Sequence, residues 1–270
     1  MHNKDPRVAP PEVAPGPLPH RLNRRALLKG VAGFGAGALA TGVASPAFAW
    51  PKWGLGNLHA SQFSAEPALA WYKLVRTITP TTPGLSALPA NRAFAYLSVT
   101  LYEAVVPGIP GRRSLAGRLN GLTTIPGPRD HAYFWPLVVN SALAASVREL
   151  FRMTSDSNKA AIDGLEASLA TQYSSGVPPG IRQRSIARGR NVAAHIMAWA
   201  ATDGGHDGHL TNFPPEYVPP VGPGLWIPTP PGFQAAYQTN WQANRPLALG
   251  PVAGYDPGPP PPFSTEPGSA

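Results

Sequence analysis

The sequence contains no cysteine among its 270 residues, and charged residues make up only 13% of it. The absence of cysteine excludes a disulfide framework and any thiol chemistry, so a stable fold has to come from packing. No stretch after residue 49 approaches the roughly 20 consecutive apolar residues that a membrane-spanning helix needs. We therefore expect no membrane association in the part of the chain that follows residue 49.

Several catalytic motifs are also missing. The sequence has no Gly-x-Ser-x-Gly nucleophile turn, no phosphate-binding glycine loop and no His-Glu-x-x-His pair. The glycine repeat Gly33-x-Gly35-x-Gly37 lies in the predicted N-terminal signal, so it does not indicate nucleotide binding. Residues 50–270 assemble no credible set of nucleophile, base and anion-stabilising groups. We therefore predict no catalytic residue.

The net charge is positive but modest. The whole chain carries +8, of which residues 1–49, with six Lys/Arg against two Asp/Glu, contribute +4. The remaining +4 is spread over more than two hundred residues, which is too little for a nucleic-acid-binding surface. We expect no nucleic-acid partner.

The N-terminal segment has the three parts of a secretory signal. Arg24-Arg25 stand before a weakly apolar, glycine-rich stretch, and Ala47-Phe48-Ala49 forms a small-x-small cleavage site. Paired arginines are typical of the twin-arginine class, in which Arg24 and Arg25 are the recognised residues. A membrane anchor is the alternative, but five glycines and a proline between Ala26 and Ala49 disfavour it. The sequence predicts cleavage after Ala49 and export to the periplasm or the extracellular space.

Apolar periodicity predicts an all-α body of about five helices in residues 50–209. The first expected helix begins near Ser64 with Pro67 in its first turn, and the second runs from Asn91 to Val106. The third extends from a cap at Asp130 to Phe151, and the fourth begins after a cap at Ser155. The fifth runs from Ile181 to Ala201. Residues 210–270 hold 16 of the 35 prolines, a density that blocks both helix and central strand. Because aromatic residues recur there, we expect an irregular, proline-rich arm whose aromatic side chains pack on the helical body.

A few polar residues are candidates for function. His206 and His209, with two aspartates close by, suit either a metal site or a structural turn after a helix, and the turn is favoured. His195 lies on an apolar helix face and fits a hydrogen-bonded core histidine better than a ligand. Glu103 has apolar neighbours, so we expect it to be partly buried and paired with an arginine such as Arg92.

Four arginines crowd the first half of the last expected helix. A solvated helix face explains them most simply, but their place near the positive end of the helix dipole leaves room for an anionic partner or for acidic neighbours within the fold. They are Arg182, Arg184, Arg188 and Arg190.

Three stretches carry a family resemblance. The segment Asn91 to Ala104, the segment Gly189 to Gly204, and the proline-tryptophan segment Gly222 to Phe233 resemble vanadium-dependent haloperoxidase-like proteins, relatives of the type 2 phosphatidic-acid phosphatases. Trp241 and Arg245-Pro246-Leu247 continue the likeness, which covers roughly residues 60–263. At the Glu103 position the family more often has aspartate.

The resemblance implies an N-terminal half without its catalytic half. In the family, vanadate or phosphate is held by a Lys and Arg pair, a Pro-Ser-Gly-His stretch and a later Arg and His, all in a C-terminal helical bundle. This sequence contains no Pro-Ser-Gly-His and ends where that bundle is expected to begin. Haloperoxidase or phosphatase activity is therefore implied for the family, and no vanadate- or phosphate-binding residue is assigned to this chain.

Three hypotheses follow. In the first, the chain is the exported scaffold half of such an enzyme and is inactive alone. It is then either a truncated product or is completed by a second chain that carries the bundle. Self-association would also cover the apolar surface that such a half exposes. In the second, it is an exported binding or structural module that acts through its proline-aromatic arm. In the third, it is a metal-dependent hydrolase that uses His206 and His209.

Overall fold

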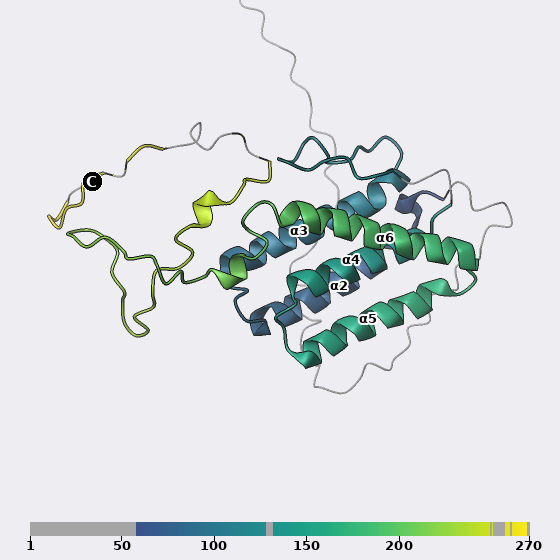
Figure 1. Cartoon of the computed structure of the whole chain (residues 1–270), viewed down its shortest axis with the longest axis horizontal. Coiled ribbons are helices and arrows are strands. Elements are labelled where there is room, and N and C mark those ends of the chain that lie inside the picture. The colour runs from purple at the N-terminus through teal and green to yellow at the C-terminus, as the bar shows by residue number, and fades with distance from the viewer. Residues whose placement is uncertain (1–57, 128–131, 249, 251–256, 260, 269–270) are drawn as a thin grey trace, which may run out of the picture. The chain divides into compact units, whose positions relative to one another are not determined.

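The computed structural model describes residues 58–127, 132–248, 250, 257–259 and 261–268. Five α-helices form the body (Figure 1): α2 (Glu66–Ile78), α3 (Ala87–Val105), α4 (Trp135–Leu150), α5 (Asp156–Ser174) and α6 (Pro179–Ala200). Short 3-10 turns lie at Ala60–Gln62, Thr79–Thr81, Val106–Gly108, Gly208–Leu210 and Trp241–Ala243. No strand occurs in the described ranges, and the prediction of an all-α fold with five helices is confirmed. The predicted signal residues Arg24, Arg25, Ala47 and Ala49 lie outside the described ranges.

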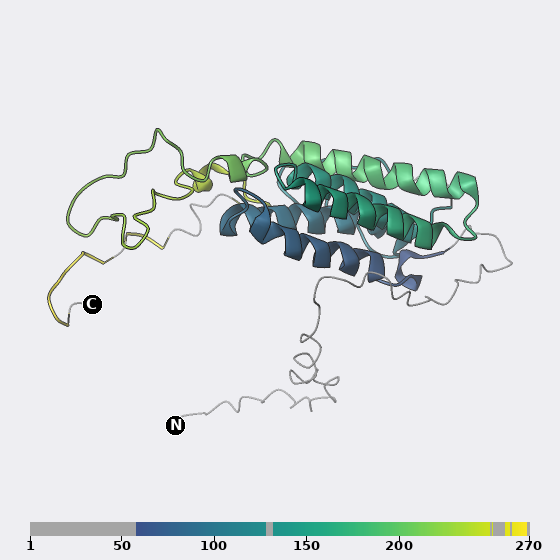
Figure 2. The same ribbon diagram turned by 90° about the horizontal axis from the view of Figure 1, so that it is seen from below.

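Helix α4 lies at the centre of the body. It contacts α2, α3, α5 and α6, and Figures 1 and 2 show it enclosed by those helices. Only a few of its sixteen residues are not fully buried. A helix that is enclosed on every side needs apolar or small residues all round its circumference, and α4 has them.

The helix starts follow from local chemistry. Ser155 caps α5 as predicted, because its Oγ accepts a hydrogen bond from the Asn158 amide at 3.3 Å. Helix α3 begins four residues before the predicted start at Asn91, since Pro89 lies in the first turn, where a missing N–H costs nothing. The residue at the cap of α4 is Phe134, and Pro136 follows in the first turn. The predicted cap, Asp130, lies outside the described residues.

Two details hold α4 to its neighbours. The Asn140 side chain accepts a hydrogen bond from the Trp71 indole at 2.9 Å and donates one to the Glu166 carbonyl at 3.0 Å, so it connects α4 with α2 and α5. On the opposite side, Gly189 of α6 lies directly against α4. A Cβ atom at Gly189 would overlap Ser141 Oγ and the Val138 carbonyl oxygen and would come within 2.9 Å of the Ala142 nitrogen.

The described residues after Leu210 are irregular apart from the turn Trp241–Ala243. The expectation that the aromatic residues of this arm pack on the body is correct for some and wrong for others. The Tyr237 hydroxyl bonds to Ser86 Oγ at 2.6 Å, and the aliphatic Leu247 of the same arm packs against the core. Trp226 and Phe233, by contrast, are 49% and 63% exposed. None of the described helices is both long enough and apolar enough to span a bilayer.

Candidate functional site

Asp203 forms a buried polar junction just after the end of α6. Its carboxylate accepts hydrogen bonds from the Tyr96 hydroxyl at 2.7 Å and from the Arg92 guanidinium at 2.5 Å. The Gly205 amide donates a third hydrogen bond at 2.8 Å. Gly204 supports this geometry, because its φ of +84° turns the chain back beneath the carboxylate. The Asp203 side chain is fully buried, so this junction fixes the loop after α6 to α3.

Burial and charge act together at this junction. Burial raises the pKa of Tyr96 well above its ordinary value, and the Asp203 carboxylate adds to the shift. Burial alone would lower the pKa of Arg92, but its hydrogen bonds with Tyr96 and Asp203 outweigh that effect and raise it. The junction therefore contains a neutral phenol and a charged guanidinium around the Asp203 side chain, and it acts as a structural support.

The arm is tethered to the body next to the same junction. The Arg245 amide donates to the Asp203 carbonyl at 2.8 Å, and its guanidinium lies over the Trp199 ring at 5.8 Å from the ring centroid. Asn120 extends the tether, since its amide donates to the Leu247 carbonyl at 2.8 Å and its side chain donates to the Pro246 carbonyl at 2.8 Å. These contacts hold the segment Arg245–Leu247 in place.

His206 and His209, the predicted metal candidates, lie in the turn after α6. His206 Nδ1 is 2.9 Å from Asp207 Oδ1, and its Nε2 is 3.7 Å from Glu149 Oε1. His209 is buried, and its Nε2 has no hydrogen-bond partner. Within the described residues no group of three or more His, Cys, Asp or Glu side chains is placed to hold a metal ion.

The charges around the two histidines explain their electrostatics. Burial lowers the pKa of His209, and the nearby Arg152 guanidinium lowers it further. Burial alone would raise the pKa of Asp207, but the hydrogen bond from Arg152 and the neighbouring His206 bring it below its ordinary value. Asp207 is thus an ionised partner of Arg152, at 2.6 Å, and His209 is a neutral buried histidine.

The expected pairing of Glu103 with Arg92 is wrong. Glu103 is almost completely buried, at 2% exposure, but its carboxylate accepts hydrogen bonds from Ser114 Oγ at 2.8 Å and from the Leu115 amide at 2.6 Å. Arg92 pairs with Asp203 instead. Glu103 therefore fixes the loop that follows α3, and no local pattern in the sequence identified the partner of Arg92.

The four arginines of α6 differ in their exposure to solvent. Arg182, Arg184 and Arg190 are exposed or half-buried, as a solvated face requires, but Arg188 is only 8% exposed. Its Nε atom is buried without a hydrogen-bond partner. The solvated-face interpretation is therefore wrong for Arg188. His195, on the same helix, is half-buried and lies 3.2 Å from the Thr123 hydroxyl through its Nε2.

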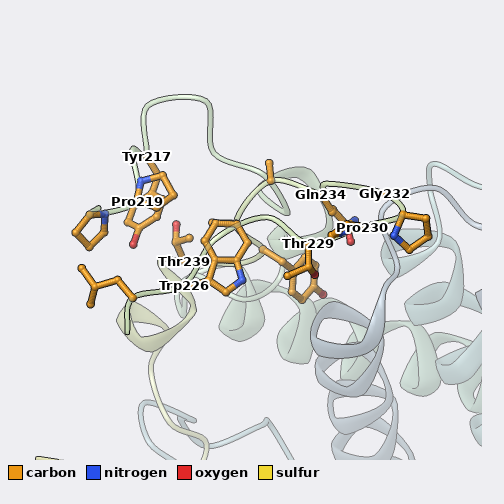
Figure 3. Close-up of a pocket in the computed structure, with 14 residues that line it drawn as sticks. Tyr217, Pro219, Trp226, Thr229, Pro230, Gly232, Gln234 and Thr239 are labelled. Carbon is orange, nitrogen blue, oxygen red and sulfur yellow. The ribbon is translucent and has the colours of Figure 1, made fainter. Parts of the chain in front are cut away.

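The arm forms a cavity of its own, with a volume of about 710 Å³, from residues between Tyr217 and Thr239. Figure 3 shows the Trp226 ring between Tyr217 and Pro219 on one side and Thr229 and Gln234 on the other. Prolines and aromatic residues make up half of the fourteen lining residues, and Gln234 and two threonines add amide and hydroxyl groups. This composition is suited to an extended, proline-rich ligand.

No protein-family profile and no curated protein sequence matches the chain. One solved structure does: a bacterial vanadium-dependent iodoperoxidase, with 31% sequence identity and a TM-score of 0.61, aligned over 76% of this chain and 47% of that protein. The chain has a haloperoxidase-like fold. It spans about half the length of the iodoperoxidase that it resembles.

Among the described residues, the junction around Asp203 does not fit the vanadate that a haloperoxidase-like fold implies. Oxyanion binding needs several cationic and amide donors that converge on one centre. The donors of this junction, Arg92, Tyr96 and the Gly205 amide, are already engaged by the buried Asp203 side chain. The printed sequence has no Pro-Ser-Gly-His stretch to supply the missing donors. We assign no vanadate-binding residue.

Proposed function

We propose that this chain is the exported helical scaffold of a haloperoxidase-like protein, whose anion-binding bundle is supplied by another segment or another polypeptide, and that it is inactive alone. The observation that carries the proposal is the alignment of most of this chain with 47% of a vanadium-dependent iodoperoxidase. Export rests on Arg24-Arg25 and the Ala47-Phe48-Ala49 site, and the secreted form is expected to begin at Trp50.

The exposed apolar surface supports a partner. Most of the large exposed hydrophobic residues belong to the arm rather than to the helical body, and Leu225, Trp226 and Ile227 are 46%, 49% and 62% exposed in succession. A monomeric soluble protein seldom leaves such a run uncovered unless something binds it. The arm is therefore the surface on which we expect the catalytic bundle to pack.

The test is reconstitution. The gene is first sequenced beyond the codon for Ala270, in all three frames and in the adjacent genes, for a Lys and Arg pair, Pro-Ser-Gly-His and a later Arg and His. The chain is then purified alone and together with that segment, and iodide oxidation by peroxide is measured with and without orthovanadate. We expect vanadate-dependent activity only when both are present, because this chain lacks the oxyanion donors.

Two results would contradict the scaffold proposal. One is vanadate-dependent oxidation by this chain alone, which would place the catalytic donors within the printed sequence. The other is the absence of those motifs from every nearby frame and gene, combined with a monomeric, cooperatively folded chain in sedimentation and denaturation measurements.

The cavity of the arm favours a second candidate function, in which the chain binds proline-rich peptides. Its own C-terminal segment offers an example, because Phe263, which follows a run of prolines, packs directly on Gly224 beside the cavity. Proline-rich segments keep an extended conformation before binding, so they lose little conformational entropy in an aromatic-lined groove.

A peptide titration tests this second candidate. A synthetic peptide with the sequence of residues 257–268 is titrated into the chain by calorimetry. Replacing Trp226 with alanine is expected to weaken binding about tenfold or more, as for a central aromatic anchor. Phe233→Ala is the matched control, because Phe233 is also an exposed aromatic residue of the arm but does not line the cavity. Equal effects of the two substitutions would exclude the cavity as the binding site.

A further inference from the structure

A second cavity, of about 690 Å³, lies along one face of α6. Arg184, Arg188, Asn191 and His195 line it from the helix, at intervals of three and four that place them on one side. Ile125 and Tyr133 belong to the opposite wall, which comes from the chain before α4. Two alanines of α6 face the space and leave it open. The volume is in the range of a small-molecule site.

Arg188 is the unusual group in this cavity. One terminal nitrogen, Nη1, donates to the Pro126 carbonyl, while Nε is buried without a partner. The guanidinium forms no ion pair with any described residue. The Tyr133 phenol and the buried acid Glu103 act on its pKa electrostatically, and both oxygens of Glu103 are already engaged by Ser114 and Leu115. A buried charge without a counter-ion is costly, so such a group normally has a partner.

The shape of the free group selects the partner. Nε and the adjacent terminal nitrogen of an arginine form a planar fork, which matches the two oxygens of a carboxylate. No acidic residue is among the described residues that line the cavity. Ile125, the alanines and the Tyr133 ring give the rest of the wall an apolar surface.

We propose that this cavity binds a small organic carboxylate with an apolar body, and that Arg188 holds the carboxylate. The buried guanidinium gives the site its charge selectivity, and Arg184 adds positive charge at the rim. Burial lowers the pKa of Arg188, as expected where compensating negative charge is scarce. The site lies outside the motifs that hold vanadate in haloperoxidases, and it does not depend on the scaffold proposal.

Benzoate and its neutral analogue benzamide are the probes. Both are titrated into the full 270-residue chain by calorimetry, and the arginine Nε–H resonances are followed by NMR. We expect benzoate to bind about tenfold or more tightly than benzamide, since the difference is a charge-assisted hydrogen bond. One Nε–H resonance, identified by its absence from the Arg188→Gln variant, is expected to shift with benzoate.

Matched variants separate the site from general charge. Arg188→Gln is expected to abolish the preference for benzoate, whereas Arg190→Gln, which removes the same charge from an exposed position of α6, leaves it unchanged. Ala194→Phe fills the cavity without altering any charge and is expected to weaken both probes. This variant keeps the test decisive if Arg188→Gln does not fold.

Four outcomes would overturn the proposal. The first is equal affinity of the chain for benzoate and benzamide, and the second is an equal loss of benzoate binding in Arg190→Gln and Arg188→Gln. The third is unchanged binding of both probes in Ala194→Phe. The fourth is benzoate binding that is detected in the Asp130→Asn variant but not in the wild-type chain. The last result would mean that Arg188 already has Asp130 as its counter-ion.

Discussion

Replacing Gly189 with alanine is expected to lower the free energy of unfolding by about 2–3 kcal/mol, although alanine is the better helix former. The added Cβ atom would overlap Ser141 Oγ and the Val138 carbonyl oxygen of α4. The second of these is backbone and cannot rotate away, so α4 and α6 have to separate. Because α4 is the helix on which all the others pack, the strain extends through the whole core.

Gly164→Ala is the matched control for this prediction. Gly164 lies in the exposed part of α5, and a Cβ atom there would meet nothing within 4 Å. The same substitution is expected to raise the free energy of unfolding by about 0.5–1 kcal/mol, because alanine restricts the unfolded chain and favours the helix. Urea denaturation followed by circular dichroism measures both. Equal stability of Gly189→Ala and wild type would contradict the close approach of α4 and α6.

The helices could be predicted from the sequence because their signals are local. A cap at Ser155 and apolar residues at intervals of three and four depend on neighbours within one or two turns. The errors are local as well. Helix α3 begins four residues before the predicted Asn91, because Pro89 lies in its first turn, where a proline removes no hydrogen bond. The start of α4 is set by Pro136 rather than by an acidic cap.

The buried polar contacts could not be predicted in the same way. Arg92 and Asp203 are separated by more than a hundred residues, and neither has a neighbour that identifies the other. Glu103 was recognised as buried from its apolar surroundings, yet its partners lie in a loop without periodicity. A pairing of this kind is decided by tertiary packing, which a single sequence does not record.

The burial of Arg188, unlike the pairing of Arg92 with Asp203, could have been predicted from the sequence. Six of the buried positions of α6 recur at intervals of three and four, and Arg188 is one of them: Ile181, Ser185, Arg188, Val192, Ile196 and Trp199. The other three arginines fall outside this set. The prediction treated all four arginines as one charged face, whereas this periodicity separates Arg188 from the other three.

Asp203→Ala is expected to have the largest effect of any single substitution at the junction after α6, a loss of about 3–5 kcal/mol. The substitution leaves Arg92 charged and buried without a counter-ion, since the Arg92 side chain is 12% exposed and the Asp203 side chain 0%. Tyr96 and the Gly205 amide lose their acceptor as well. Asp163→Ala is the control, because its ion pair with Arg148 is exposed and is expected to contribute less than about 1 kcal/mol.

A second substitution tests whether the unpaired charge of Arg92 causes the loss of stability in Asp203→Ala. Adding Arg92→Met to Asp203→Ala is expected to recover part of the lost stability, because an apolar side chain of similar length removes the unpaired charge. The arm provides an independent measurement, since Arg92 also donates to the Arg245 carbonyl, next to the segment that tethers the arm. In Asp203→Ala we expect faster proteolysis between residues 211 and 248, and in Asp163→Ala no change. If Asp203→Ala were as stable as Asp163→Ala, the junction would not be the support that joins the arm to the body.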